Sequence, residues 1–331
     1  MSKTFSPKNK SKFPKLYVAP VSKIVTDTVM EFTESERTLV GFIPSRRQID
    51  INGGYLTEFK NIANFHQYVK ERNIKIPVCR DHGSFYQGTQ RNPYEDIMYL
   101  IWESNYLDII HVDVFKTRAD IETHAILTGL AVELIKCTNS SHLPYLEFGT
   151  EEAIFKYDHI DIDLFLRSIW HDPLYMVIQS GTKLKNNINT GQYDKEEFLR
   201  QLNVVKRNNI LTKEHNGDFL DLDLVREKFK LGLDAINICP ELAQIQTKTL
   251  LEKCNESQLT HWYNLCMEAG YYKKWVSQDF NLQDKEKLVL AVGHYHFNDK
   301  TIHSLTKANK NLIAANVTSW LKSFTNSIYD R

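Results

Sequence analysis

The stretch Ile76-Pro77-Val78-Cys79-Arg80-Asp81-His82-Gly83 is a short apolar run that ends in an acid, a histidine and a glycine. A second stretch of the same kind, Ile210-Leu211-Thr212-Lys213-Glu214-His215-Asn216-Gly217, lies far along the chain. A carboxylate beside an imidazole, presented where a strand meets a loop, can bind a divalent metal and move a proton within one site. Two such strand ends predict a metal-assisted site at the mouth of a parallel barrel.

Short apolar runs of this kind recur along the chain and alternate with amphipathic helical patterns. The runs are rich in Ile, Val, Leu and Tyr and cover residues 38–43, 76–80, 109–114, 144–148, 175–179, 210–213 and 235–238. Helical patterns, with apolar residues three and four apart, cover 61–72, 121–136, 161–170, 195–206 and 222–231. Strands that alternate with helices pair in parallel, because a parallel neighbour is reached only through a crossover connection.

This alternation predicts a (β/α)8 TIM barrel with extra C-terminal helices. No glycine-rich phosphate loop follows the first predicted strand, which argues against a doubly wound dinucleotide-binding sheet. Residues 288–293 (LVLAVG) are the candidate for the eighth strand, after a helical insert at about 255–280. We expect residues 1–35 to form an N-terminal arm or irregular lead-in and residues 36–331 to form a single barrel domain.

Composition restricts the class of protein. The 41 Lys and Arg balance the 41 Asp and Glu, so no global basic field indicates binding to nucleic acid. No apolar run approaches the roughly 20 residues that a membrane span needs. The five cysteines show no CxxC spacing and predict buried, reduced thiols. We therefore expect a cytoplasmic protein that binds neither nucleic acid nor membrane.

Side chains at the carboxyl ends of parallel barrel strands converge on one mouth. The residues that follow the predicted strands are rich in carboxylates, imidazoles and cations. They include Arg46, Arg47, Gln48, Asp81, His82, Asp113, Glu147, Glu151, Gln179, Lys183, Lys213, Glu214, His215, Asn237 and Glu241. Strand ends in a barrel without a site would not need such a concentration.

The histidines among these residues also have a purely structural interpretation. A lone histidine at a strand end is more often a hydrogen-bonded loop residue than a metal ligand. His111, in the middle of the run IIHVDVF, can be a satisfied core histidine. The pairs Asp81-His82 and Glu214-His215 shift the balance toward a site, because each supplies an acid beside the imidazole.

The remaining candidates keep two interpretations each. Arg46 and Arg47 are either solvated surface charges or a cradle for a phosphate or carboxylate. His294 and His296 (GHYHF) alternate as strand neighbours would and are a weaker candidate for a metal pair.

The order of motifs resembles a known family. The segments 44–55 (PSRRQIDINGGY), 80–83 (RDHG), 110–113 (IHVD), 148–151 (FGTE), 213–218 (KEHNGD) and 237–241 (NICPE) look like those of the accessory, so-called non-catalytic, subunit of class II tagatose-bisphosphate aldolase. The resemblance covers roughly residues 39–251, with an echo at 293–297. Here Arg46 and Arg47 stand where family members are mostly neutral and small, and the loop 152–157 lacks the glycines of the family. These departures suggest a different substrate or a divergent branch.

The resemblance implies a TIM barrel related to zinc-dependent class II aldolases and to ketose 4-epimerases. Such a protein would act on a phosphorylated or acidic ketose by retro-aldol chemistry. His82 and His215 would bind Zn²⁺ or another divalent ion, together with Glu147 or Glu151. Asp81 would exchange a proton with the C4 hydroxyl, with Glu214 and Asp113 as further catalytic candidates. The residues expected to bind the substrate are Arg46, Arg47, Gln48, Lys183, Lys213 and Gly217.

The family name also supports an alternative without catalysis. In that case the chain is a barrel that binds and stabilises a class II tagatose-bisphosphate aldolase, and its helical outer face should carry an apolar patch. A homo-oligomer is a further possible assembly. The sequence does not separate an aldolase from an epimerase, because both use one site and differ in how well the cleaved fragment is retained.

Overall fold

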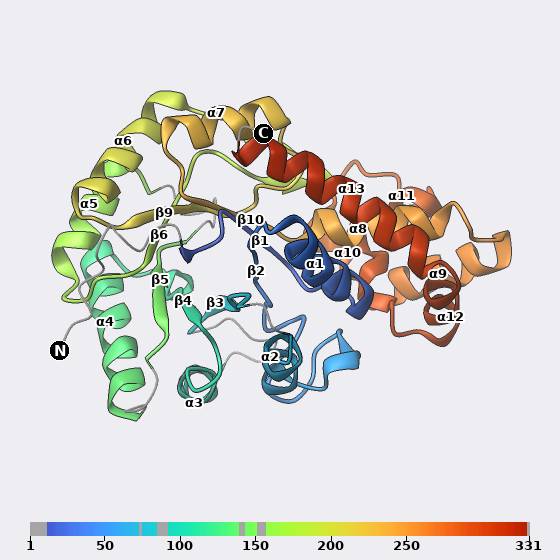
Figure 1. The fold of residues 1–331 in the computed structure, drawn as a ribbon, viewed down its shortest axis with the longest axis horizontal. Coiled ribbons are helices and arrows are strands. Elements are labelled where there is room, and N and C mark those ends of the chain that lie inside the picture. The colour runs from blue at the N-terminus through green and yellow to red at the C-terminus, as the bar shows by residue number, and fades with distance from the viewer. Residues whose placement is uncertain (1–11, 73–74, 85–91, 139–142, 151–156, 330–331) are drawn as a thin grey trace.

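The computed structural model describes residues 12–72, 75–84, 92–138, 143–150 and 157–329 (Figure 1). At its centre lie eight parallel strands: β1 (Leu16–Val18), β2 (Val40–Phe42), β3 (Cys79–Gly83), β4 (Ile109–Val112), β5 (Tyr145–Phe148), β6 (Tyr175–Ile178), β9 (Leu211–Glu214) and β10 (Ala235–Ile238). Their order in the sheet is β2-β1-β10-β9-β6-β5-β4-β3. Isolated parallel bridges from Phe42 to Val78 and from Ser45 to Asp81 join β2 to β3. The sheet therefore closes into the predicted (β/α)8 barrel.

The strand that completes the barrel is not the predicted one. β1 lies between β10 and β2, with Leu16 paired to Ile236 on one side and to Val40 on the other. The strand predicted at 288–293 is wrong, because residues up to Val292 belong to the helix α11 (Lys285–Val292). The run LVLAV is apolar throughout, and such a run fits a buried helix face as well as a strand.

The lead-in at residues 1–35 is correspondingly more regular than expected. Besides β1, it contains nearly all of the helix α1 (Lys23–Glu36), which begins at the N-cap residue Ser22. β2 is equally short but lies in the longer apolar run 38–43, whereas β1 is bounded by Lys15 and Pro20, so its few apolar residues show no period that the sequence pattern could reveal. All three residues of β1 are fully buried.

Helices connect the strands and form the outer layer of the barrel. They are α1, α2 (Ile62–Lys70), α3 (Pro93–Glu103), α4 (Ile121–Thr138), α5 (His159–Ser168), α6 (Lys195–Arg207) and α7 (Leu222–Leu231). The five helices predicted from apolar spacing, α2 and α4 to α7, are confirmed. Most begin at an Asn or Asp whose side chain accepts a hydrogen bond from a first-turn amide, as at Asn61, Asp158, Asp194 and Asp221.

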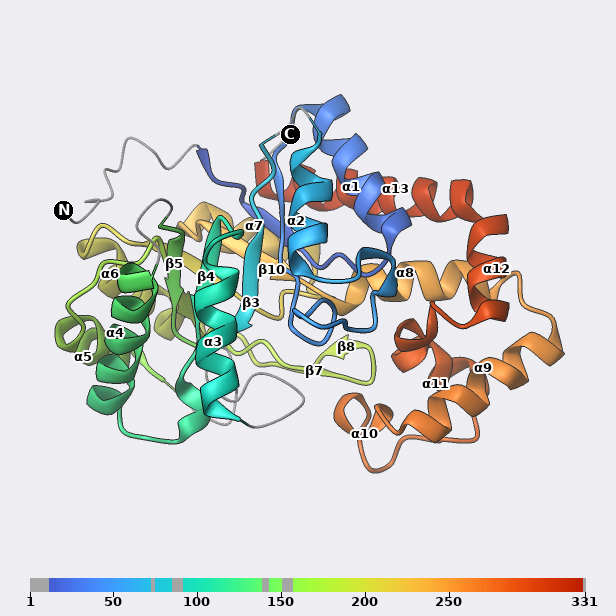
Figure 2. The same cartoon turned by 90° about the horizontal axis from the view of Figure 1, so that it is seen from below.

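A helical region follows the last strand and covers one side of the barrel (Figures 1 and 2). It consists of α8 (Pro240–Leu251), α9 (Glu256–Ala269), α10 (Tyr272–Trp275), α11, the 3-10 helix η4 (Gly293–His296), α12 (Lys300–Ala308) and α13 (Lys310–Tyr329). The long helix α13 packs against α1, α7 and α8. In the part of the chain that is described, no helix combines the length and the apolarity needed to cross a membrane.

Two short 3-10 helices and one hairpin complete the described elements. The helices are η2 (Thr57–Phe59) and η3 (Phe115–Thr117), and the hairpin consists of β7 (Leu184–Lys185) and β8 (Ile188–Asn189). Its turn residues, Asn186 and Asn187, have φ of 51° and 62°. Two consecutive positive φ values are typical of the tight hairpin turns that favour Asn.

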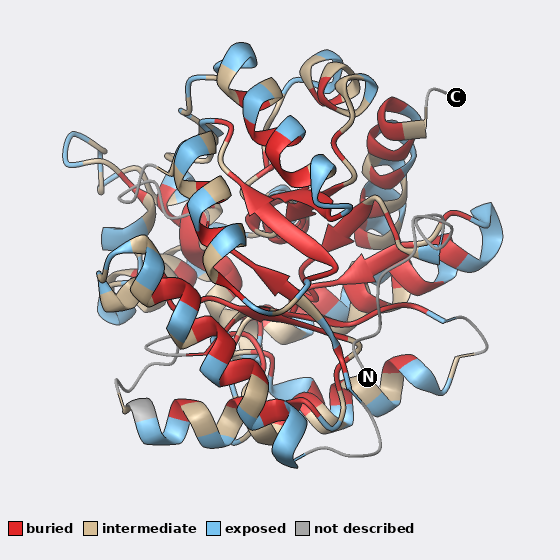
Figure 3. Cartoon of the chain, turned by 90° about the vertical axis from the view of Figure 1, so that its left-hand side faces the viewer, coloured by how far each residue is buried: buried red, intermediate tan, exposed pale blue. Residues whose placement is uncertain are grey.

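The strands form the buried centre of the molecule (Figure 3). Inside the barrel, the Tyr17 and Tyr175 hydroxyl oxygens lie 3.2 Å apart. The Lys213 Nζ lies 3.9 Å from the centroid of the Tyr17 ring, a cation–π contact. Gly41 faces Tyr17, and a Cβ at that position would overlap the phenol ring. These residues fill the barrel interior, so the candidate site lies above a packed floor. All five cysteines are unpaired, but the predicted burial holds for Cys79 and Cys266 alone, since Cys239 and Cys254 are half-buried and Cys137 is exposed.

Candidate metal and substrate site at the barrel mouth

An irregularity at the end of β3 positions both Asp81 and His82. In a regular strand, successive side chains point to opposite faces. Here the pairing of β3 with β4 shifts between Arg80 and Gly83, and His82 has a positive φ of 50°. A non-glycine residue rarely adopts this conformation, and such residues cluster at functional sites. As a result, Asp81 and His82 both face the mouth.

A carboxylate holds the His82 ring. Its Nδ1 lies 2.9 Å from Oδ2 of Asp113, a fully buried residue directly after β4. The other Asp113 oxygen accepts a hydrogen bond from the Phe115 amide. Since a carboxylate accepts hydrogen bonds, His82 Nδ1 donates to Asp113, and Nε2 is the ring nitrogen on the side of Asp81.

A second carboxylate holds the ring of His215, which follows β9. His215 Nε2 lies 2.6 Å from Oε1 of Glu147 on β5, and the second Glu147 oxygen accepts from Lys213 Nζ at 2.7 Å. Burial alone would raise the pKa of the Glu147 carboxyl. The charge of Lys213 and the hydrogen bond from His215 outweigh burial and hold the pKa well below its ordinary value. Glu147 is therefore ionised and accepts from His215 Nε2, which leaves Nδ1 as the ring nitrogen that faces Asp81.

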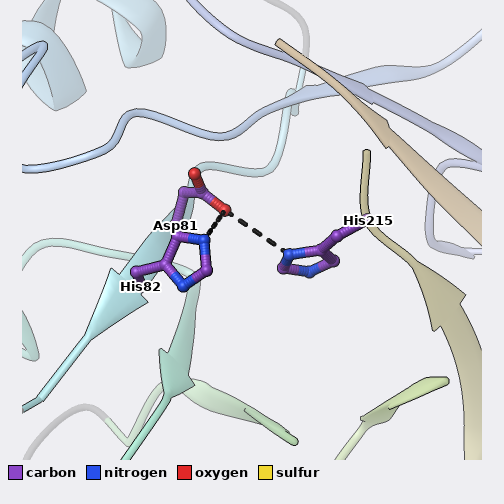
Figure 4. Close-up of side chains that lie close together, drawn as sticks. All are labelled: Asp81, His82 and His215. Atoms are coloured by element: carbon purple, nitrogen blue, oxygen red, sulfur yellow. Dashed lines mark ion pairs between the residues drawn. The ribbon is translucent and has the colours of Figure 1, made fainter. Parts of the chain in front are cut away.

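These two ring nitrogens, His82 Nε2 and His215 Nδ1, lie close to one carboxylate oxygen (Figure 4). Asp81 Oδ1 is 3.9 Å from His82 Nε2 and 3.8 Å from His215 Nδ1. The two imidazole centroids are 5.8 Å apart, so the structure brings together these two histidines from distant parts of the chain. Donor atoms of the three residues lie within 4.8 Å of one another. Ligands of a tetrahedral zinc ion, each about 2.1 Å from the metal, are roughly 3.4 Å apart.

This donor set fits a divalent metal. Two imidazoles and a carboxylate are the ligands of catalytic zinc sites. Metal-bound histidines usually donate their second ring N–H to a carboxylate or carbonyl, which fixes the tautomer. His82 and His215 both do so, through Asp113 and Glu147. The chemistry and spacing of the residues therefore fit the ion that the resemblance implies.

A second possible group consists of His111, Glu147 and His215. His111 is buried on β4, and its Nε2 lies 2.8 Å from the Gly149 carbonyl oxygen. Its Nδ1 accepts from the His82 amide at 3.4 Å. Burial lowers the pKa of His111, so the ring is neutral. Because its two ring nitrogens both have protein partners, His111 acts as a core histidine and fits a metal less well than His82 does.

Two residues predicted for the site lie away from the mouth. Glu214 faces outward from β9 toward α7, where Lys228 Nζ donates to its oxygens at 2.8 and 2.9 Å. This is the regular alternation of a strand, which turns Glu214 away when His215 points inward. Gly217 donates its amide to the Asn237 carbonyl at 3.1 Å, so that amide is already used.

Lys213 does lie inside the barrel, but below the mouth. It is fully buried and bonded to Glu147. Burial opposes its charge, yet the nearby Cys79 and Glu147 raise its pKa, so it is an ammonium. From this position its ammonium donates to Glu147 and helps to hold that carboxylate against His215.

The predicted anion-binding residues divide into buried and exposed groups. Arg46 is buried, forms ion pairs with Asp96 and Asp50, and lies 4.3 Å from the centroid of the Tyr99 ring. Arg47 and Lys183, by contrast, are exposed. Glu151 lies outside the described residues.

Gln48 is buried near the end of β10. Its Oε1 accepts from the Ser45 amide at 2.9 Å, and its Nε2 lies 3.8 Å from Cys239 Sγ. Gln48 thus links the loop after β2 to the loop after β10 at the mouth.

The structure adds one residue to which the sequence gave no role. Asn237 lies on β10 in register with Tyr17, so its side chain points into the barrel. Only 3% of Asn237 is exposed, and neither side-chain polar atom has a hydrogen-bond partner among the described residues. A buried amide without a partner is costly and is often satisfied by a ligand or water. Its place at a strand end was visible in the sequence, but its missing partners were not.

Comparison with known proteins yields similarity of fold only. No protein-family model matches the chain, and no curated protein does. Among solved structures, a probable tagatose 6 phosphate kinase from Sinorhizobium meliloti has a TM-score of 0.70 at 14% identity, covering 95% of this chain and 100% of its own. A fructose-bisphosphate aldolase from Campylobacter jejuni gives 0.61 at 13% identity, with 96% and 92% covered.

A fructuronate-tagaturonate epimerase from Cohnella laeviribosi gives a TM-score of 0.64 at 10% identity, covering 95% of this chain and 81% of its own. At these identities the likeness shows a shared barrel architecture and does not transfer an activity.

Proposed function

We propose that the protein is a metal-dependent carbohydrate aldolase or 4-epimerase that acts on a phosphorylated or acidic ketose. The observation that carries this proposal is the convergence of Asp81, His82 and His215, with each imidazole held by its own carboxylate. The structural similarity to proteins described as an aldolase and as a hexuronate epimerase supports it, since both belong to this reaction class.

In this proposal His82, His215 and Asp81 hold the ion. A bound divalent metal supplies Lewis-acid polarisation of a substrate carbonyl, typically worth several kcal/mol of barrier. Asp113 and Glu147 keep the two imidazoles in the tautomers that the ligand set needs. The ammonium of Lys213, which lies below the mouth, keeps Glu147 ionised.

Asp81 is the carboxylate to which we assign proton exchange with the C4 hydroxyl. Its side chain is 12% exposed, whereas those of Asp113 and Glu147 are fully buried, so a substrate hydroxyl can reach Asp81 alone among the three. A carboxylate has two oxygens, and one can stay in the ligand set while the other takes the proton. Asn237, whose side-chain amide has no hydrogen-bond partner among the described residues, adds a donor and an acceptor inside the barrel for hydroxyls of the sugar.

A metal-binding measurement tests the proposal first. The purified protein should bind about one zinc ion per chain, and His82→Ala and His215→Ala should each abolish stoichiometric binding. His303→Ala, on α12, is the matched control and should bind zinc like the wild type. Zinc binding that survives in both His82→Ala and His215→Ala would contradict the assigned site.

The reaction is tested with fructose and tagatose phosphates and with hexuronates, followed by carbon NMR with and without a chelator. Release of an aldehyde fragment identifies an aldolase, and inversion at C4 identifies an epimerase. In both cases activity should disappear with the chelator and in His82→Ala. Turnover that is insensitive to the chelator would refute metal dependence.

A second candidate function, a barrel that binds a class II aldolase subunit, is favoured by one observation. The outward faces of α4 and α5 expose large apolar side chains in rows four residues apart. These are Ile126, Leu130 and Leu134 on α4 and Ile160 and Leu164 on α5, with Trp170 beside them. Ile160 is 64% exposed and Trp170 53%. Exposed apolar side chains gathered on neighbouring helices in this way are typical of a protein–protein interface.

Sedimentation of the protein alone and with a class II aldolase distinguishes these roles. Leu130→Asp should abolish assembly if this face is an interface. A helper role further requires that His82→Ala still raises the activity of the partner. The enzymatic role requires that the same variant is inactive.

A further inference from the structure

The main chain at His215 is not fixed by the sheet. The pairing of β9 with its neighbours β6 and β10 ends at Glu214, one residue before His215. Beyond it, Asn216 and Phe219 have positive φ values of 54° and 57°, so the chain leaves the strand direction at once. Carbonyl groups in such a loop need hydrogen-bond donors from elsewhere in the molecule. The conformation of this loop, residues 215–219, therefore depends on the segment that supplies those donors.

The donors come from residues 182–191, which contain the β7–β8 hairpin and are called here the hairpin segment. Thr182 Oγ1 donates to the His215 carbonyl at 3.0 Å. Asn189 Nδ2 donates to the carbonyls of Asn216 and Asp218, both at 3.0 Å. Two side chains of the hairpin segment thus hold three carbonyls of the loop, and one of these carbonyls belongs to His215 itself.

The Asn189 side chain is held in the orientation that this contact needs. Its Oδ1 accepts from the amides of Lys183 and Gly191, each at 3.2 Å, which leaves Nδ2 for the loop. The two ends of the hairpin segment also approach each other closely. A Cβ at Gly191 would overlap the Gly181 carbonyl, and Gly181 has a φ of 90°, a conformation that suits glycine. The base of the segment is therefore narrowly defined.

The far end of the hairpin segment is anchored on the helical region after β10 (Figure 2). The Asn186 amide donates to the Trp275 carbonyl at 2.9 Å. Asn186 and Ser277 exchange two hydrogen bonds, of 2.7 and 2.8 Å. Asn187 Oδ1 accepts from Gln244 Nε2 on α8 at 2.7 Å. The segment therefore connects the helical region to the loop after β9.

The hairpin segment has little apolar packing of its own. Ile188 is 55% exposed, and Leu184 is only half-buried. A two-stranded hairpin without a packed face is at best marginally stable by itself. Its shape therefore depends on the hydrogen bonds at both ends, and a change at one end should loosen the other.

We propose that Thr182 and Asn189 are positioning residues for the metal ligand His215, and that the anchored hairpin segment makes metal affinity depend on the helical region. Glu147 holds the His215 ring through Nε2 at 2.6 Å, and Thr182 holds the His215 carbonyl at 3.0 Å. With both ends of the residue held, the ring has little freedom to turn away from Asp81. Groups that orient a metal ligand typically contribute about ten- to hundredfold to metal affinity. This inference rests on the proposed function, because His215 is a ligand there.

Zinc affinity, measured by competition with a chromophoric chelator, tests the two positioning contacts. Thr182→Val replaces the hydroxyl by a methyl group and should weaken zinc binding about tenfold. Thr182→Ser keeps the hydroxyl and should restore most of the affinity. Thr190→Val is the matched control, because the Thr190 hydroxyl donates to the Lys183 carbonyl within the hairpin segment, and this variant should bind zinc like the wild type.

Asn186→Gly tests the anchor on the helical region. It removes both side-chain bonds to Ser277, and glycine keeps the positive φ without strain. Zinc binding should weaken about fivefold, as expected for loss of a typical hydrogen bond, although residue 186 touches no ligand. Thermal melting shows that each variant is folded at the assay temperature. Wild-type zinc affinity in folded Asn186→Gly would overturn the role of the anchor.

Hydrogen exchange of the metal-free protein separates this inference from the proposed function. Peptides that cover residues 215–219 should exchange faster in Thr182→Val than in the wild type, and Thr190→Val should match the wild type. If the wild type binds no zinc, the proposed function fails, but faster exchange in Thr182→Val still supports the positioning of His215. Unchanged exchange of the loop, or unchanged zinc affinity of Thr182→Val in a protein that does bind zinc, overturns the inference.

Discussion

The buried ion pair between Glu214 and Lys228 allows a sharp test of how β9 is oriented. The two side chains are 0% and 1% exposed, and both Glu214 oxygens accept from Lys228 Nζ. Ser180 Oγ also donates to Glu214 and accepts from Lys228 at 2.7 Å. This network lies between β9 and α7, on the far side of the strand from His215. The substitution Lys228→Met removes the cation and leaves the carboxylate buried.

Such a substitution should destabilise the protein strongly. Removing one partner of a buried ion pair costs about 3–5 kcal/mol, because the remaining charge is desolvated and uncompensated. For a chain of 331 residues, at about 2.1 cal/mol/K of unfolding entropy per residue, this lowers Tm by about 4–7 °C. The double variant Lys228→Met, Glu214→Leu should recover most of the loss, since apolar pairs of similar volume replace buried ion pairs at little cost.

Urea unfolding followed by circular dichroism measures these differences, with Lys230→Met as the exposed control on the same helix. The control should change stability by no more than about 0.5 kcal/mol. Below its unfolding transition, Lys228→Met should retain turnover, because nothing at the mouth has changed. A cost under about 1 kcal/mol, or a turnover that collapses in folded protein, would refute the outward placement of Glu214.

Three further predictions follow from buried groups. Burial lowers the pKa of His294 to about 3, below the 6.5 of an exposed imidazole, so the unfolded chain binds its proton first as the pH falls. The stabilising contribution of the neutral imidazole is therefore present above pH 6.5 and lost toward pH 3. Between pH 7 and 5, the unfolding free energy of His294→Gln should fall by about 2 kcal/mol less than that of the wild type, as measured by urea titrations. Asn237→Ala should leave the urea midpoint nearly unchanged, because the side-chain amide has no hydrogen-bond partner among the described residues, while kcat/KM should fall at least tenfold. Turnover equal to that of the wild type would contradict a contact with substrate. A Cβ at Gly217 would overlap Ile236, so Gly217→Ala should cost about 1–3 kcal/mol of unfolding free energy, and adding Ile236→Val should restore part of it if packing is the cause.

The periodicity of the sequence was sufficient for seven of the eight barrel strands and for five of the helices between them. It failed at β1, where three buried residues carry no measurable period, and at α11, where an apolar run fits two structures. In both cases contacts with distant segments decide whether the run becomes a strand or a helix. Leu16 becomes a strand residue because Ile236 and Val40 lie on either side of it.

The two acid–histidine pairs look alike in sequence and differ in three dimensions. Glu214 and His215 follow regular strand alternation and separate to opposite faces, whereas the positive φ of His82 lets Asp81 and His82 share one face. The residue types do not reveal where a strand departs from regular geometry, because the departure depends on how β3 pairs with β4.

By itself, the sequence determined the alternation of strands and helices, and hence a parallel barrel whose strand ends carry acids and imidazoles. Local spacing is enough for this, because apolar periodicity is a property of neighbouring residues. Only the tertiary structure decided which of those side chains meet: that Asp113 and Glu147 hold the two histidines, that Arg46 is buried with Asp96, and that α10 is bonded to the β7–β8 hairpin. Contacts between residues far apart in the chain depend on barrel closure and on how each strand is turned, which local patterns do not encode.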